Sequence, residues 1–460
     1  TRNMIFADLA EVYFPESFKL DGSKLGKRRA GFEKVLITRK SFVDSSLADL
    51  DEQKAVQHVL SSIALSLTLK VLFVKILTER RGDNFPANVR QAIDRWSSSF
   101  PGILRAEPYD VLEFSDQAQE KIANMFAPIG VLEALLFQAS DNPIGDIWDG
   151  LVESEFDDLQ VKSLGNVYTP RPIVNAMVDA SEKALGGWVG KNVLEPACGS
   201  GHFVREVYKR IRNAYLNERK IVKTNPVIAH RKALEHLRAI DIDPFAVQTT
   251  QLGMFLELYR STDVWKAVAP NDKFDFSTVV DRADFLDDGL GAKFSDFTPS
   301  LVIGNPPYGI EVTKSVSERY DINNNDSYGY FIIRALNLLD VTGRLLFVVS
   351  STFLTVRTHQ RLRKKIFEKG IIHSIYQLHR NTFAGRDVFC ALIDFERSAL
   401  TPSLKYNYRY IDAWSIHPKM PEFLLALDNW TGRCNSKIPD TLFREYQTNA
   451  SLAKLRQQPP

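Results

Sequence analysis

Cysteine is scarce in this chain, and the few cysteines lie far apart. Cys198, Cys390 and Cys434 form no Cys-x-x-Cys pair. This spacing argues for a reducing compartment and against a zinc site or a disulfide framework, so we expect no metal. A membrane-length apolar run is also missing, because the run over residues 63–77 is short and contains two lysines. No signal peptide is apparent either, and we expect a cytoplasmic protein without membrane association.

The chain also lacks an excess of charge of either sign. It has 58 Lys and Arg against 56 Asp and Glu, a net charge of +2. Any surface for nucleic acid must therefore be a local patch. A hydrophobic content of 44% and a charged content of 25% are typical of a soluble globular protein. At 460 residues, we expect two or three domains.

Residues 1–160 carry helical signals. Apolar residues recur at helical spacing over residues 53–81, and Gly82 follows as a stop. A second helical stretch covers about residues 115–138. Residues 141–146 are rich in turn-forming types. We therefore predict an all-helical N-terminal domain, 1–160, that ends near this turn-rich segment.

Short apolar runs then alternate with amphipathic stretches. The runs cover residues 192–194, 237–242, 277–280, 301–303, 344–349, 371–376 and 388–395. This alternation predicts an α/β fold with a doubly wound, seven-stranded, mostly parallel sheet over residues 161–400. Ligands of such a sheet bind at the carboxyl ends of the strands. Residues 401–460 are a C-terminal extension with no clear pattern.

The fourth apolar run ends in the tetrapeptide Asn305-Pro306-Pro307-Tyr308. Proline fixes φ and has no N–H, so the carbonyl groups of Asn305 and Pro306 are held in place outside a ladder. A planar amino group can donate to the Asn305 side-chain oxygen and the Pro306 carbonyl while its ring stacks on Tyr308. The tetrapeptide therefore suits the exocyclic amine of a base. By itself, it is equally consistent with a strand that ends in a Pro-Pro turn.

Two motifs upstream suit a nucleotide-type cofactor. The run from Glu195 to Phe203 ends a strand, continues as a Gly-Ser-Gly turn and opens a helix. Such a turn lets a ligand approach backbone N–H groups. The next strand ends in Asp241 and Asp243, either of which can accept from ribose hydroxyls. Both acids also fit a surface turn.

A third motif, Asp284-Phe285, follows the next predicted strand. Here the carboxylate can accept from an adenine amino group while the phenyl ring stacks on the purine. The same pair also fits a loop acid followed by a core phenylalanine. Following the glycine turn and the acids of the preceding strand, it completes an adenosine pocket.

In this order the motifs resemble those of the gamma-class amino-methyltransferases, which modify adenine at N6 in DNA in restriction–modification systems. The correspondence runs from motif X at Tyr168–Pro170 through motif I at Glu195–Phe203, motif II at Asp241, motif III at Asp284-Phe285, motif IV at Asn305–Tyr308, motif V at Ser327–Phe331 and motif VI at Gly343–Ser350 to motif VIII at Phe383. It covers about residues 165–395 and implies a Rossmann-like methyltransferase fold with S-adenosylmethionine as the cofactor.

The resemblance also implies residue roles. The cofactor would lie against Tyr168, Thr169, Pro170, Glu195, Ala197, Cys198, Gly199, Gly201, Phe203, Asp241, Asp243, Asp284, Phe285, Asn305 and Phe331. Catalysis would fall to Asn305, Pro306, Pro307 and Tyr308, with Phe383 packed against a flipped target base. Two positions depart from the family pattern. His202 replaces a smaller or amide residue, and we expect it to be a contact or packing residue; Asp241 is shorter than the usual Glu, so the ribose contact can shift to Asp243.

Double-stranded DNA is the expected partner. Basic runs at residues 357–369 and 19–40 are candidate phosphate contacts, although such runs also form solvated faces. About 65 residues follow Phe395, which leaves little room for a domain that selects a DNA sequence. We therefore expect a specificity subunit or a C-terminal target-recognition domain outside this chain, and a nuclease or translocase module elsewhere in the full enzyme. The alternatives are methylation of RNA bases or protein glutamine, and an inactive DNA-binding scaffold.

Overall fold

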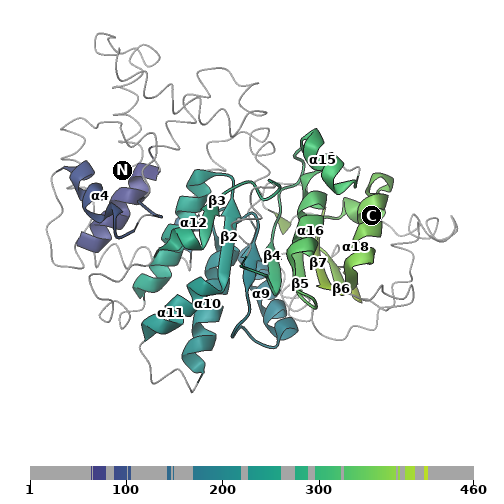
Figure 1. Ribbon diagram of the computed structural model, residues 1–460, viewed down its shortest axis with the longest axis horizontal. Coiled ribbons are helices and arrows are strands. Elements are labelled where there is room, and N and C mark those ends of the chain that lie inside the picture. Colours follow the sequence, from purple (N-terminus) through teal and green to yellow (C-terminus); the bar gives the residue numbers. More distant parts are fainter. Residues whose placement is uncertain are drawn as a thin grey trace, which may run out of the picture.

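One mixed sheet of eight strands runs through the part of the chain that the computed structural model describes (Figure 1). That part comprises residues 64, 66–78, 88–100, 102–104, 142–146, 149, 169–218, 226–260, 275–287, 296–322, 326–379, 382–383, 389–398 and 409–412. The strands are β1 (Val193–Glu195), β2 (Leu237–Asp241), β3 (Val280–Arg282), β4 (Leu301–Gly304), β5 (Arg344–Ser350), β6 (Gly370–Gln377), β7 (Cys390–Arg397) and β8 (Arg409–Asp412). Their order across the sheet is β3-β2-β1-β4-β5-β7-β6-β8.

The strand order reverses between β1 and β4. From β1 the chain moves outward through β2 to β3, all parallel, and then returns to the other side of β1 as β4, which is followed by parallel β5. Strand β7 lies antiparallel between β5 and β6, and β8 extends the edge parallel to β6. In open α/β sheets, ligands bind outside the carboxyl ends of the strands where the order reverses.

The central strands form because their sequences are almost continuously apolar. All four residues of β4, Leu-Val-Ile-Gly, are buried, and so is every residue of β5 except the last. Such runs are typical of parallel strands that are covered on both faces. The middle of the sheet is therefore core, and only the strand ends are available to a ligand.

Most of the helices form two groups over the two halves of the sheet. The helices are α9 (Arg171–Leu185), α10 (His202–Asn217), α11 (Pro226–Glu235), α12 (Pro244–Arg260), α15 (Lys314–Tyr320), α16 (Ser327–Leu338), α17 (Thr352–Thr355) and α18 (Gln360–Lys369). Helices α10, α11 and α12 contact β2, and α10 also contacts β1 and α12 contacts β3; α16 contacts β5 and α18 contacts β6, whereas α9 contacts both α10 and β5. Figure 1 shows these two groups on either side of the β1–β4 junction.

All seven strands predicted from the sequence are present, and the sheet is mostly parallel as predicted. The prediction for residues 277–280 is wrong in its first part. Residues Phe276–Thr278 form a short 3-10 helix, because the Asp275 carboxylate accepts from the Ser277 N–H at 2.9 Å and closes a turn there. The strand begins only at Val280. Strand β8 was not predicted.

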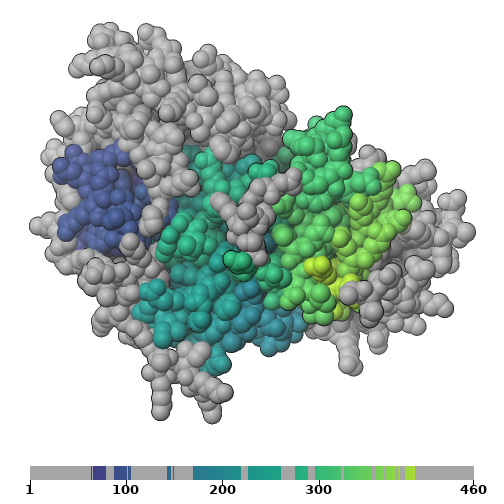
Figure 2. Space-filling model, viewed as in Figure 1, coloured from purple at the N-terminus to yellow at the C-terminus, as the bar shows by residue number. Residues whose placement is uncertain are grey.

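The described N-terminal residues are helical and pack against α12. They include residues 66–78 and α4 (Val89–Ser97). The Phe255 ring of α12 lies 4.4 Å from that of Phe73 and 5.8 Å from that of Phe100, centroid to centroid. Figure 2 shows this region on the side of the molecule that carries α10–α12. The boundaries 1–160, 161–400 and 401–460 stay predictions.

Several segments named above lie outside the described residues. These are residues 1–63, including the basic run 19–40, the second helical stretch 115–138, and residues 413–460. In the described part of the chain, every helix is too short or too polar to cross a membrane. Residues 141–146 were predicted as a turn-rich domain boundary; from Asn142 to Asp146 they form a helical turn, and this turn packs onto the site.

Candidate active site

The carboxyl ends of β2, β1 and β4 are adjacent and carry Asp241, Glu195 and Asn305, respectively. Strand β1 is parallel to both neighbours, and Glu195 lies opposite Ala239 of β2. A Cβ added to Gly304 would lie only 3.3 Å from the Glu195 Cγ, so this side chain reaches the β4 backbone just before Asn305. The structure thus brings three predicted site residues to one edge of the sheet.

The turn after β1 is anchored to β2 and α12. The Gly199 N–H donates to Asp241 Oδ2 at 2.8 Å, and the Thr250 hydroxyl donates to the Gly199 carbonyl at 2.9 Å. The Cys198 N–H donates to the Ile240 carbonyl at 2.9 Å. Gly199 has a φ of 51°, a conformation that glycine adopts without strain. Thr250 is a site residue that sequence reasoning missed, because nothing in a helix interior signals contact with a distant turn.

Gly201 ends this turn, and its conformation and neighbours require a glycine at this position. Its φ is 82°, and a Cβ here would lie 2.6 Å from the Thr250 Oγ1. Helix α10 begins at the next residue, so its start lies at the edge where the three polar side chains lie, and its Val204 N–H donates to the Glu195 carboxylate. The start of a helix attracts negatively charged groups.

Three predicted cofactor residues of this turn point their side chains into the core. Ala197 packs against the core, and Cys198 and Phe203 are buried. Burial raises the pKa of the Cys198 thiol well above its ordinary value, and the nearby carboxylates add to this. A thiol of this kind is inert. These residues can therefore offer a ligand only backbone groups and shape.

Glu195 is a buried acid with an unmet polar atom. Burial raises the pKa of its carboxyl, the charge of Asp241 adds to the rise, and a hydrogen bond from the Val204 N–H opposes it. Within the described chain, Glu195 Oε2 has no hydrogen-bond partner. Leaving such an oxygen buried and unpaired is costly, so the site favours a ligand that brings a donor or a positive charge.

Asp241 and Asp243 have different roles. Besides holding Gly199, Asp241 accepts from the Asp243 N–H at 2.8 Å, and burial raises the pKa of Asp241 to about 6. Asp243 accepts from the Phe245 N–H at 2.9 Å at the start of α12. Each carboxylate oxygen can accept more than one hydrogen bond, so both remain suitable for ribose hydroxyls. Ile242 between them is 47% exposed, an apolar surface at the site that its sequence context did not signal.

The surroundings of Asp284 and Phe285 differ from those predicted for an adenine clamp. Asp284 is exposed and accepts from the Leu286 N–H at 2.8 Å. The Phe285 ring is buried, 5.1 Å from the Phe331 ring, and the Arg334 guanidinium lies 5.4 Å from its centroid. The ring is therefore occupied by protein contacts, and the described geometry offers a purine the Asp284 carboxylate more readily than the Phe285 face.

The Asn305 amide is oriented by Thr169. Its Nδ2 donates to the Thr169 hydroxyl at 3.1 Å, and Thr169 is buried. Because the donor side of the amide is turned to Thr169, Oδ1 is the acceptor that the site can present. Thr169 and Pro170 immediately precede α9, so the predicted motif X lies beside the tetrapeptide. Tyr168 lies outside the described residues.

The start of α16 holds the rest of the tetrapeptide. The Ser327 hydroxyl donates to the Pro307 carbonyl at 2.6 Å, and the Asp326 carboxylate accepts from the Gly309 N–H at 2.9 Å. The Tyr308 hydroxyl lies 3.6 Å from the Cys390 Sγ of β7, and its ring is 9% exposed. Pro306 is buried. Contacts from α16 and β7 thus hold the tetrapeptide, in addition to the restriction that its prolines impose.

Phe383 and the downstream basic run are less exposed than predicted. Phe383 is 1% exposed and belongs to the core. Arg363 is buried and donates to the Phe353 and Val356 carbonyls at 2.7 and 2.9 Å, so the prediction of a phosphate contact is wrong for this residue. Arg361 pairs with Asp321 at 3.0 Å, and its side chain remains 60% exposed.

The fold is that of methyltransferases from restriction–modification systems. A methyltransferase subunit of a type I system from Streptococcus thermophilus superimposes with a TM-score of 0.50 at 14% identity, covering 94% of this chain and 88% of that one. The ATP-dependent Type ISP enzyme LlaBIII bound to DNA gives a TM-score of 0.54 at 14% identity, covering 93% of this chain and 31% of that one. At these identities the likeness concerns the fold alone.

Comparisons of sequence define the class of methyltransferase more closely than the fold does. Residues 235–383 match the family model of the Eco57I restriction-modification methylases. The chain is 28% identical over 251 residues to a type II methyltransferase of Thermus thermophilus, and the match covers 51% of this chain and 46% of that protein. The match therefore spans about half the length of this curated relative. The predicted resemblance to restriction–modification methyltransferases is confirmed.

The glycine turn gives a test of its own geometry. We expect Gly201→Ala to destabilise the fold by about 3 kcal/mol, because a left-handed alanine costs about 1–2 kcal/mol and the contact with Thr250 adds a similar amount. Gly190→Ala is the matched control, since Gly190 also has a positive φ of 70° but no atom within 4 Å of an added Cβ. Thermal melts compare the two. Equal losses would show that Thr250 does not confine the turn.

Proposed function

We propose that this chain transfers a methyl group from S-adenosylmethionine to N6 of an adenine flipped out of double-stranded DNA, as the modification part of a restriction–modification enzyme. The observation that carries the proposal is the position of Asn305–Tyr308. This rigid acceptor platform ends β4, next to the buried Glu195 and the glycine turn of β1. The Thr169 contact orients its amide.

The residues present fit the cofactor. Glu195 Oε2, buried and without a partner within the described chain, suits an ammonium group. The carboxylates of Asp241 and Asp243 suit ribose hydroxyls, and the exposed Asp284 suits an adenine amino group. The start of α10 suits a carboxylate. When bound, S-adenosylmethionine supplies an electrophilic methyl group.

The chain would act on the amine by orientation. The Asn305 Oδ1 and the Pro306 carbonyl accept the two amino hydrogens, and the nitrogen lone pair then turns out of the ring plane. Thr169 holds the Asn305 amide before the substrate arrives, and the fixed φ of the two prolines restricts the Pro306 carbonyl, so the rate gain comes from preorganised dipoles. No covalent intermediate on the enzyme is needed. The proton lost from nitrogen would pass to solvent.

A base inside a duplex does not reach such an edge, so the proposal includes base flipping. Tyr308 and Phe383 would replace the lost stacking, which contributes ~1–3 kcal/mol per base. Tyr308 already has an exposed fraction, whereas Phe383 becomes available only after the groups that cover it move. The base would therefore meet Tyr308 first.

We infer the partners of this chain from how little of a relative's length it matches. Because the match spans only 46% of the Thermus thermophilus methyltransferase, we infer that sequence selection resides in a specificity subunit or a target-recognition domain, and that any nuclease or translocase module belongs to the full enzyme. The LlaBIII structure, an ATP-dependent restriction-modification enzyme on DNA, supports this arrangement at the level of fold. A DNA substrate of this kind places the enzyme in the cytoplasm.

Asn305 carries the first test of this function. We expect Asn305→Ala to lower methyl transfer to duplex DNA by at least about a hundredfold, because one preorganised hydrogen-bond partner of the amine is lost. The affinity for S-adenosylmethionine should stay within a few-fold. Labelled-methyl transfer and calorimetric binding measure the two quantities. Asn337→Ala, a change at an exposed position on α16, is the control and should leave both near wild type.

Two outcomes would contradict this role. Transfer by Asn305→Ala at the wild-type rate would remove Asn305 from the reaction. Loss of cofactor affinity in a variant that still folds would assign Asn305 to cofactor binding alone.

Asp241 predicts a pH dependence. Since burial raises its pKa to about 6, the carboxyl is protonated through more of the acid range than an ordinary aspartate. Only the carboxylate accepts from a hydroxyl and from the Gly199 N–H together. We therefore expect the affinity for S-adenosylmethionine to fall about tenfold from pH 7 to pH 5, with a midpoint near 6. Asp241→Asn should bind weakly and show no midpoint; an unchanged profile in this variant would exclude Asp241 as the titrating group.

A further inference from the structure

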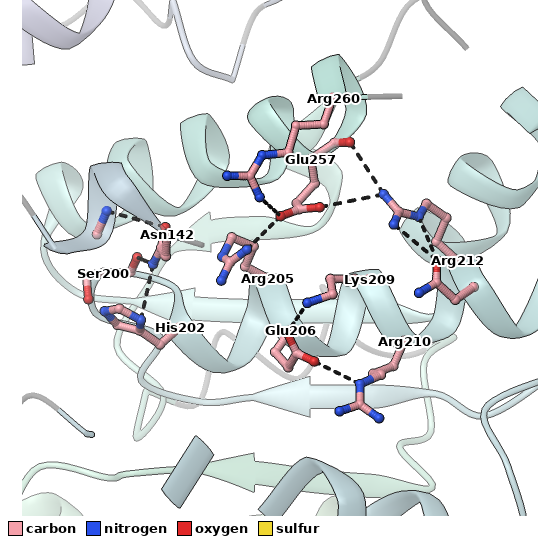
Figure 3. Close-up of polar contacts among 12 residues, drawn as sticks. Asn142, Ser200, His202, Arg205, Glu206, Lys209, Arg210, Arg212, Glu257 and Arg260 are labelled. Carbon is pink, nitrogen blue, oxygen red and sulfur yellow. Dashed lines mark hydrogen bonds and ion pairs between the residues drawn. The ribbon is translucent and has the colours of Figure 1, made fainter. Parts of the chain in front are cut away.

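A segment far upstream of the glycine turn is bonded to it by side chains. The Asp149 carboxylate lies 2.8 Å from His202 Nε2 and accepts from the Ser200 hydroxyl at 3.1 Å. The Asn142 Nδ2 lies 3.3 Å from His202 Nδ1 and 3.5 Å from the Ser200 carbonyl (Figure 3). We call these four residues, Asn142, Asp149, Ser200 and His202, the N-terminal clasp.

The hydrogen bonds of the clasp are mutually consistent. The Gly145 N–H donates to the Asn142 Oδ1 at 3.4 Å, which turns the Asn142 Nδ2 toward His202. His202 Nδ1 is then an acceptor, so the proton of a neutral ring sits on Nε2 and is donated to Asp149. Both ring nitrogens have roles that one tautomer satisfies.

The clasp is closely packed. Asn142, Ser200 and His202 are all buried. Gly145 lies so near the turn that an added Cβ would be 3.0 Å from the Ser200 carbonyl oxygen. This is a built interface between the N-terminal region and the first residues of α10.

The clasp contacts the glycine turn beside the two glycines whose backbone is least restricted. Gly199 and Gly201 both have positive φ and gain the widest freedom of any residue if released. The side-chain hydrogen bonds from Asp241 and Thr250 reach the turn at Gly199, and Thr250 also packs closely against Gly201. The body of α10 is fixed independently, since Arg205 forms a buried ion pair with Glu257 of α12 at 2.6 Å (Figure 3). Ser200 and His202 remain, and the clasp holds these two.

We propose that Asp149 is a positioning residue through which the N-terminal region holds the glycine turn in its cofactor-binding shape. The cofactor site is then shared between two parts of the chain that are 53 residues apart in sequence. Binding of S-adenosylmethionine and docking of Asn142 and Asp149 favour each other, so a change in the N-terminal region is transmitted to cofactor affinity. This inference rests on the proposed function for the identity of the ligand.

The experiment measures S-adenosylmethionine binding to the full chain by calorimetry, without DNA. Asp149→Ala should raise Kd by about tenfold, the fold-change for losing one hydrogen bond to a charged group. Asp149→Asn keeps an acceptor and should recover part of the affinity. His202→Ala should weaken binding similarly, and the double variant Asp149→Ala/His202→Ala should bind no worse than the weaker single variant, because the two side chains act as one unit.

Asp179→Asn is the matched control. Asp179 pairs with Arg210 in the body of α10 at 2.8 Å, so this change removes a carboxylate contact to the same helix away from its start. Its Kd should stay within twofold of wild type. Thermal melts confirm that each variant is folded at the temperature of the titration, and in steady-state assays of Asp149→Ala the KM for S-adenosylmethionine should rise by a larger factor than kcat falls.

The outcomes separate the clasp from the proposed function. If wild type binds S-adenosylmethionine and folded Asp149→Ala binds it equally well, the proposed role of the clasp is wrong, and the proposed function is unaffected. Equal weakening by Asp179→Asn would also overturn the clasp, since the effect would then be general to α10. If wild type does not bind S-adenosylmethionine, both proposals fail.

Discussion

One carboxylate joins the ends of two strands, and the site depends on it. Asp241 accepts from the Gly199 N–H and from the Asp243 N–H, each at 2.8 Å, so it fixes the turn after β1 and the entry into α12 together. Burial opposes this arrangement, since it raises the Asp241 pKa to about 6. A half-buried carboxylate without donors would be costlier, and two backbone donors are what make the charge tolerable. The position of the glycine turn then determines where α10 begins.

The order of the strands converts this local geometry into a site. Because the sheet reverses between β1 and β4, Glu195 lies between Asp241 on one side and Asn305 on the other. A ligand that reaches from the Asp241 carboxylate across the glycine turn to the Asn305 amide therefore contacts three neighbouring strand ends. The same edge is covered from outside by Thr169 before α9 and by the start of α16. Gly199, the Asn305 amide and the Pro307 carbonyl are thus each held by a side chain from another element.

Sequence patterns revealed the parts of the site that local rules govern. The β4 tetrapeptide, the glycine turn and the acids of β2 each follow an apolar strand, and their relative positions follow from parallel pairing. Phe285 was harder, because nothing in the sequence shows that Arg334 and Phe331 occupy its ring. Arg363 looked like surface charge, yet it donates to two carbonyls in the interior. The contact of Asp149 with His202 joins residues 53 positions apart and has no local signature.

We propose that the Asn305–Tyr308 edge methylates adenine in DNA. The most direct measurement incubates the chain, together with its sequence-selecting partner, with duplex DNA and S-adenosylmethionine carrying a deuterated methyl group. Nucleosides from the digested DNA are then identified by mass spectrometry. We expect labelled N6-methyladenine in wild type and its loss in Asn305→Ala. Label on cytosine, or label found only in RNA or protein, would contradict it.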